Sequence, residues 1–169
     1  MLEEAISELW DFIAQQFRDT IAGARPEELE YHPFRDEYSI SELAWQAIGT
    51  CYRWSVVLAG ATTVDEAVEM NPRAIDLLQA ASGGYTPGRF PTTMPAESDE
   101  ILDRADDVLA AVGAHLMEFG AAERELTYRT WWHGSLTGDE IAARLLWTLG
   151  HADGQIRLLI GYCRRPHPS

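Results

Sequence analysis

Basic residues are scarce in this chain of 169 residues. Lysine and arginine together number 13 against 27 aspartates and glutamates, so the formal net charge is −14 at pH 7 and the isoelectric point is near 4.6. Binding to a nucleic-acid backbone or to an anionic membrane surface would therefore begin with electrostatic repulsion. We expect neither nucleic acid nor membrane among the partners of this protein.

Cysteine is also rare, with Cys51 and Cys163 the only two. Both fall on apolar faces of predicted helices, where a free thiol behaves as a small hydrophobic group. The N-terminal stretch is acidic and amphipathic and lacks the basic start and apolar run of a secretory signal. No stretch has the roughly 20 apolar residues of a membrane span. The sequence therefore predicts a cytoplasmic protein with reduced, buried thiols.

The short motifs of common catalytic sites are missing too. There is no HExxH, CxxC, P-loop or GxSxG sequence. None of the five histidines has another histidine or a carboxylate four residues away on a predicted helix, the spacing of a metal-binding pair. No serine or cysteine has a base at a diagnostic spacing, and no two carboxylates are predicted to converge in a dry cleft. The sequence identifies no catalytic residue.

Apolar residues are plentiful, at 46% of the chain, and in four long stretches they recur every three to four residues. This spacing is typical of amphipathic helices. It predicts helices over residues 2–22, 39–60, 98–120 and 137–164. A chain of this length can bury a full core without disulfides or a metal. We expect one all-α domain over residues 1–169, an antiparallel four-helix bundle with short extra helices.

Two of the predicted helices begin with a clear capping signal. Ser39 precedes Glu42 by three residues, and Thr137 precedes Glu140 by the same interval. This is the spacing of a capping box, in which the hydroxyl and the carboxylate each accept a hydrogen bond from the other residue's backbone N–H. Pro166 predicts the end of the last helix.

The connections between these helices differ in character. Residues 63–81 predict one or two short helices, broken at Asn71-Pro72. Residues 82–97 are rich in glycine and proline and predict a long loop that covers part of the domain. Residues 126–132 carry the only strand-like pattern. Residues 27–38 predict a polar loop with three aromatic residues available to pack over an end of the bundle, namely Tyr31, Phe34 and Tyr38.

A few polar residues lie at the edges of the apolar stripes and predict a pocket between the second and last long helices. The second helix contributes Gln46, and the last helix contributes Thr148, His151 and Gln155. At about 100° per residue, Thr148 points into the stripe and His151 points about 120° away from its centre. His133 follows two tryptophans in a connection that could cover the pocket, although a plain loop histidine is the favoured interpretation.

The remaining histidines and the tryptophans have simpler interpretations. We expect His32 and His167 to face solvent and His115 to be half-buried. Trp54 lies on the core stripe. The other tryptophans considered fall on flanks or loops, where they could complete helix packing, contact a second copy of the chain or line a pocket; they are Trp45, Trp131, Trp132 and Trp147.

Two helix sequences together resemble a known family. The stretch SISELAWQAIGTCYRW, with a helix end at Gly60, is similar to the second helix of DinB-like (YfiT-like) proteins, and LLWTLGHADGQIRLL is similar to their last helix. The resemblance implies an up-down-down-up four-helix bundle that is often dimeric. Many members bind nickel or zinc through three histidines. Relatives include mycothiol-dependent maleylpyruvate isomerase and bacillithiol transferases.

The resemblance carries the three metal ligands onto Gln46, Thr148 and Ala152, and none of these is a histidine. Zinc and nickel prefer imidazole and thiolate to an amide or a hydroxyl. We therefore expect no metal and no other cofactor. A homodimer remains expected, with Trp45 and Trp147 as candidate contacts.

Three functional hypotheses remain open. The first is a metal-free DinB-like protein of unassigned reaction that binds a small-molecule ligand or a partner. The second is a metal- or thiol-dependent transferase or isomerase with a rebuilt site that includes His151. The third is a scaffold or interaction bundle without a pocket. Fold analogy alone names no substrate.

Overall fold

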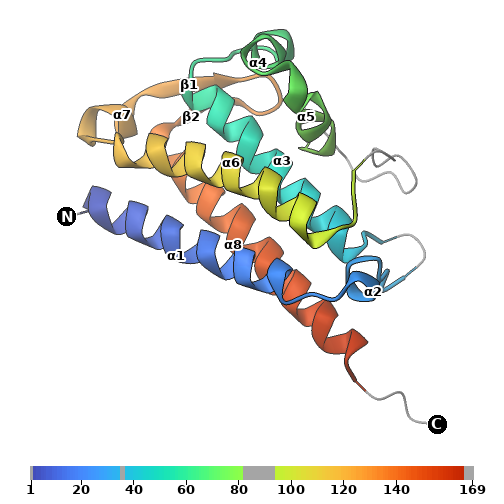
Figure 1. The fold of residues 1–169 in the computed structure, drawn as a ribbon. Coiled ribbons are helices and arrows are strands. Elements are labelled where there is room, and N and C mark those ends of the chain that lie inside the picture. Colours follow the sequence, from blue (N-terminus) through green and yellow to red (C-terminus); the bar gives the residue numbers. More distant parts are fainter. Residues whose placement is uncertain (1, 35–36, 82–93, 166–169) are drawn as a thin grey trace.

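A computed structural model describes residues 2–34, 37–81 and 94–165 (Figure 1). This part of the chain is mostly helical and contains one small two-stranded sheet. The prediction of an all-α protein is therefore confirmed at the level of fold class. Most of the predicted loop over residues 82–97 lies outside the described residues, as does His167.

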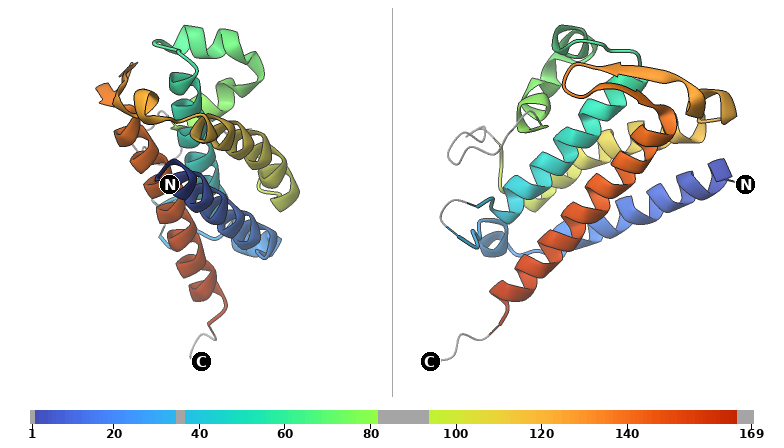
Figure 2. Two further views of the ribbon diagram at one scale, coloured as in Figure 1. Left: turned by 90° about the vertical axis from the view of Figure 1, so that its left-hand side faces the viewer. Right: turned by 180° about the vertical axis from the view of Figure 1, so that it is seen from behind.

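Four long helices form the body of the molecule, and they are α1 (Leu2–Ala22), α3 (Ile40–Leu58), α6 (Ser98–Met117) and α8 (Gly138–Cys163). Both α1 and α3 pack against α6 and also against α8, an arrangement visible from two sides in Figure 2. Each helix lies within its predicted range. The largest difference is the end of α6, where the N–H of Phe119 bonds to the carbonyl of Leu116 and the chain turns away.

The predicted capping boxes are present at α3 and α8. The Ser39 hydroxyl accepts a hydrogen bond from the Glu42 backbone N–H, and the Glu42 carboxylate accepts one from the Ser39 backbone N–H. Thr137 and Glu140 make the same pair at α8. These reciprocal bonds satisfy backbone donors that a helix start leaves free, and so they define where both helices begin.

Short elements join the long helices, namely α2 (Pro26–Leu29), α4 (Val64–Met70), a 3-10 turn η1 (Pro72–Ala74), α5 (Ile75–Ala81) and α7 (Ala121–Glu125). The predicted break at Asn71-Pro72 is confirmed, since Asn71 is extended and separates α4 from η1. Neither α2 nor α7 was expected, because four or five residues are too few to show a helical period.

A β-hairpin precedes α8. Strand β1 (Thr127–Thr130) pairs antiparallel with β2 (Gly134–Thr137), and Gly134 has a φ of +78°, which favours glycine. The first strand lies within residues 126–132, where a strand pattern was noted. The second strand was missed because its pairing partner, rather than its own sequence, makes it a strand.

The core is built from the apolar stripes of the four long helices, and two interior side chains differ from expectation. Trp45 was assigned to a flank but is only 1% exposed, and its indole N–H donates to the carbonyl of Pro95 at 2.7 Å. It therefore cannot contact a second copy of the chain. Cys51 is fully buried, and burial raises its thiol pKa to about 12. Cys163 is half-buried rather than buried.

The remaining predictions of burial and exposure agree with the structure. His32 is exposed and His115 is half-buried, as expected. Trp54 belongs to the core at 3% exposure. Within the described residues, no helix combines the length and the apolar character needed to cross a membrane.

Candidate functional site

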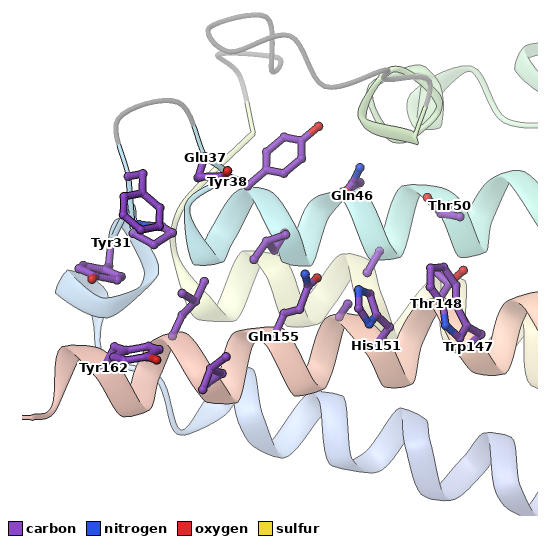
Figure 3. Close-up of a pocket in the computed structure, with 17 residues that line it drawn as sticks. Tyr31, Glu37, Tyr38, Gln46, Thr50, Trp147, Thr148, His151, Gln155 and Tyr162 are labelled. Atoms are coloured by element: carbon purple, nitrogen blue, oxygen red, sulfur yellow. The ribbon is translucent and has the colours of Figure 1, made fainter.

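A cavity of about 830 Å³ opens between α3 and α8. Side chains from both helices form its walls, and the connection between α2 and α3 lines one end (Figure 3). The lining positions on α8 recur every three or four residues, so they share one face of the helix, which an α-helical period requires.

Four of the five predicted pocket residues line this one cavity. Gln46 comes from α3, and Thr148, His151 and Gln155 come from successive turns of α8. Gln46 and Thr148 are half-buried, whereas His151 and Gln155 are exposed. The two helices therefore bring an amide, a hydroxyl, an imidazole and a second amide to the same space, each able to bond to a polar group of a bound molecule.

Two stacked aromatic rings, both from α8, form part of the cavity wall. The rings of Trp147 and His151 are stacked, with their centroids 4.9 Å apart and their planes 8° from parallel. Trp147 is 66% exposed, which is unusual for the largest apolar side chain. This stack restricts the orientation of the imidazole and presents a flat apolar surface beside the polar residues of α8.

The opposite end of the cavity is aromatic, and the sequence did not place it in the pocket. Tyr31, Phe34 and Tyr38 come from the α2–α3 connection, and Tyr162 comes from the last turn of α8 (Figure 3). The three ring-bearing residues of the connection were expected to cover an end of the bundle. Three aromatic residues in an otherwise polar loop were the one sequence feature that could have predicted this half of the site.

A buried carboxylate holds that connection near the end of α8. Glu28 of α2 is 1% exposed and accepts hydrogen bonds from Arg164 at 2.8 and 2.9 Å and from the Arg25 guanidinium at 2.6 Å. The bonds from Arg164, followed by those from Arg25, outweigh the cost of burial and lower the pKa of Glu28 to about 2. The pair Glu28–Arg164 thus ties α2 to α8 beside the aromatic end of the cavity.

His133 lies away from this cavity. It is exposed, and its Nε2 is 2.9 Å from the Arg144 guanidinium. The neighbouring Trp132 packs edge-on against Trp54 at 4.8 Å, and the Arg53 guanidinium lies 4.1 Å from the centre of the Trp132 ring. The connection that was expected to cover the pocket therefore packs against α3 and does not line the cavity.

The residues at the family's metal positions do not fit nickel or zinc. Gln46, Thr148 and Ala152, the positions that the resemblance assigns to the metal ligands, all line the cavity. Their side chains supply an amide, a hydroxyl and a methyl group, and none has the imidazole or thiolate that these metals prefer. Over the described ranges, no three histidine, cysteine, aspartate or glutamate side chains are grouped to hold a metal ion.

No family model matches the chain, and no curated protein is significantly similar to it. The DinB-like assignment therefore rests on the two helix sequences on α3 and α8 and remains a hypothesis.

Proposed function

We propose that this protein is a metal-free DinB-like bundle that binds a small organic molecule in the groove between α3 and α8. The observation that carries the proposal is the cavity of about 830 Å³, with aromatic rings at both ends and uncharged polar groups between them. Small-molecule sites are typically concave, mostly apolar and furnished with a few polar groups that orient the ligand. A bundle that served only as a scaffold would need no such cavity.

The direction of the long helices supports the up-down-down-up topology of the proposed family. In Figure 1, α1 and α8 run from left to right, and α3 and α6 run the opposite way. The two sequence stretches that resemble the family lie on α3 and α8, and both helices line the cavity. The proposed ligand site thus coincides with the metal slot of the family, with different side chains in it.

Binding without catalysis is the function that the lining side chains favour. His151 is the only histidine among the described residues of the cavity wall. Its ring stacks on that of Trp147, and no described carboxylate is hydrogen-bonded to it. A histidine that acts as a catalytic base is typically oriented by a hydrogen bond to its second nitrogen. A hydrophobic groove with uncharged polar groups needs no such arrangement to bind a ligand.

A titration with indole, a neutral aromatic probe, tests the proposal. We expect NMR shifts at the backbone amides of α3 and α8 that line the groove and at the Trp147 side chain. Thr148→Trp would fill the groove and should abolish these shifts. Ala143→Trp adds the same ring to an exposed position of α8 outside the cavity and should leave binding unchanged. Shifts that avoid the groove, or that survive Thr148→Trp, would reject the proposed site.

A further inference from the structure

The described residues that line the cavity carry little formal charge. Among the described residues that line it, Glu37 is the only one with a formal charge when histidine is neutral. Glu37 is exposed, and its carboxylate makes no ion pair with any described residue. Of the other carboxylates in this region, Glu28 is buried and pairs with Arg25 and Arg164, whereas Glu42 accepts the Ser39 backbone N–H and lies 4.0 Å from Nδ1 of His32. A ligand in the groove therefore meets one negative charge, on Glu37, that no described residue neutralises in an ion pair.

Aromatic rings gather around the same end of the cavity. Tyr31, Phe34, Tyr38 and Tyr162 line it together with Glu37 (Figure 3). The face of an aromatic ring carries partial negative charge and attracts cations. The Arg165 guanidinium already lies 4.9 Å from the centre of the Tyr162 ring, so Tyr31, Phe34 and Tyr38 are the rings left for a ligand cation. A carboxylate that lines a cavity together with several aromatic rings favours an ammonium or guanidinium group.

The rest of the groove is uncharged. Gln46 and Thr50 on α3 and Gln155 on α8 provide hydrogen-bonding groups on its walls, and Leu158 and Leu159 add apolar surface. With His151 neutral, this part suits an apolar or neutral polar body. The formal net charge of −14 on the whole chain also attracts cations and repels anions over a longer range.

We propose that the groove selects an organic cation, with its charged head at Glu37 and the surrounding rings and its neutral body extended along α3 and α8. This inference rests on the proposed function, since it assigns a chemical class to the ligand of that groove. It excludes organic anions as preferred ligands, because no cationic side chain among the described lining residues would pair with them.

Choline and its uncharged isostere dimethylbutanol, in which carbon replaces the quaternary nitrogen, provide a direct test because they differ in charge and not in shape. We expect NMR titrations at low salt to give about tenfold tighter binding of choline, from the carboxylate and the ring faces together. Glu37→Gln should reduce this preference to about twofold or threefold. Glu69→Gln removes the same charge from an exposed residue of α4 outside the cavity and should keep the full preference.

The outcomes separate the two proposals. Equal binding of choline and dimethylbutanol by the wild-type protein, or a choline preference that stays at about tenfold in Glu37→Gln, would overturn the assignment of a cation and leave the groove as a binding site. Binding of indole without any binding of choline would have the same meaning. Failure of indole, choline and dimethylbutanol alike to shift the groove resonances would overturn the proposed function itself.

Discussion

Glu28 is the side chain whose charge matters most for the folded state. It is buried, and two arginines from different parts of the chain hydrogen-bond to it. A carboxylate buried without partners would be strongly destabilising. The hydrogen bonds from Arg25 and Arg164 offset this cost and allow Glu28 to be buried. Because Glu28 lies in α2 and Arg164 follows α8, this contact fixes where the α2–α3 connection meets the groove.

We predict that Glu28→Gln lowers the free energy of unfolding by about 2 kcal/mol at pH 7, since an amide cannot pair with two guanidinium groups. The folded-state pKa of Glu28, about 2, is depressed below its ordinary value of 4.5. Its contribution is therefore fully present above about pH 5 and is lost as the pH falls toward 2. Urea unfolding of both proteins across this range should show their difference in stability shrinking with acidity.

Glu27→Gln is the matched control for this prediction. Glu27 is the adjacent residue of α2, is 67% exposed and makes only a surface contact with Arg25 at 3.4 Å. Its substitution should change stability by less than about 0.5 kcal/mol at any pH. Equal effects of the two substitutions would contradict the role assigned to Glu28.

At the scale of elements, α3 and α5 pack closely against each other at Gly49. A Cβ atom on Gly49 of α3 would lie 2.3 Å from the carbonyl oxygen of Leu77 and 3.1 Å from the backbone nitrogen of Ala81. Both of these atoms belong to the α5 backbone, which cannot rotate away as a side chain would. The absence of a side chain at position 49 is thus what allows α5 to lie against α3.

We predict that Gly49→Ala destabilises the protein by roughly 2–3 kcal/mol, because α5 must move away from α3. Gly154→Ala in α8 is the matched control, since a Cβ there meets no atom within 4 Å. In a helix interior that change should stabilise the protein by about 0.5–1 kcal/mol. Thermal unfolding followed by circular dichroism measures both, and a stabilising effect of Gly49→Ala would refute the close contact.

At the scale of the whole molecule, exposed aromatic side chains bear on the expected homodimer. Trp45 is excluded by its burial, whereas Trp147 is 66% exposed on α8. Aromatic residues are enriched in the cores of protein interfaces. The large net negative charge opposes the association of two copies, so a dimer would have to be held by apolar contact and would be strengthened by salt.

We predict a homodimer at micromolar concentration, with a light-scattering mass of about twice the chain mass of 18.9 kDa. Trp147→Arg should convert it to a monomer by placing a charge in the apolar contact. Phe12→Arg changes another exposed aromatic residue, on α1, and should leave the dimer intact. A monomeric wild-type protein would contradict the dimer, and a dimeric Trp147→Arg variant would contradict its location.

Local sequence was sufficient for the features that depend on neighbours along the chain. The helical period and the capping boxes at Ser39 and Thr137 located the long helices, because a helix makes its hydrogen bonds within a few residues. The same period placed Thr148, His151 and Gln155 on one side of α8, where they line the cavity.

Contacts between distant segments decided the rest. The indole of Trp45 is bonded to the carbonyl of Pro95, 50 residues further along the chain, and the bond from Arg164 to Glu28 holds the aromatic end of the groove near α8. His133 lies outside the cavity because the hairpin before α8 packs its tryptophans against α3. Periodicity states which face of a helix is apolar, but burial of a residue at the edge of that face depends on which remote segment covers it.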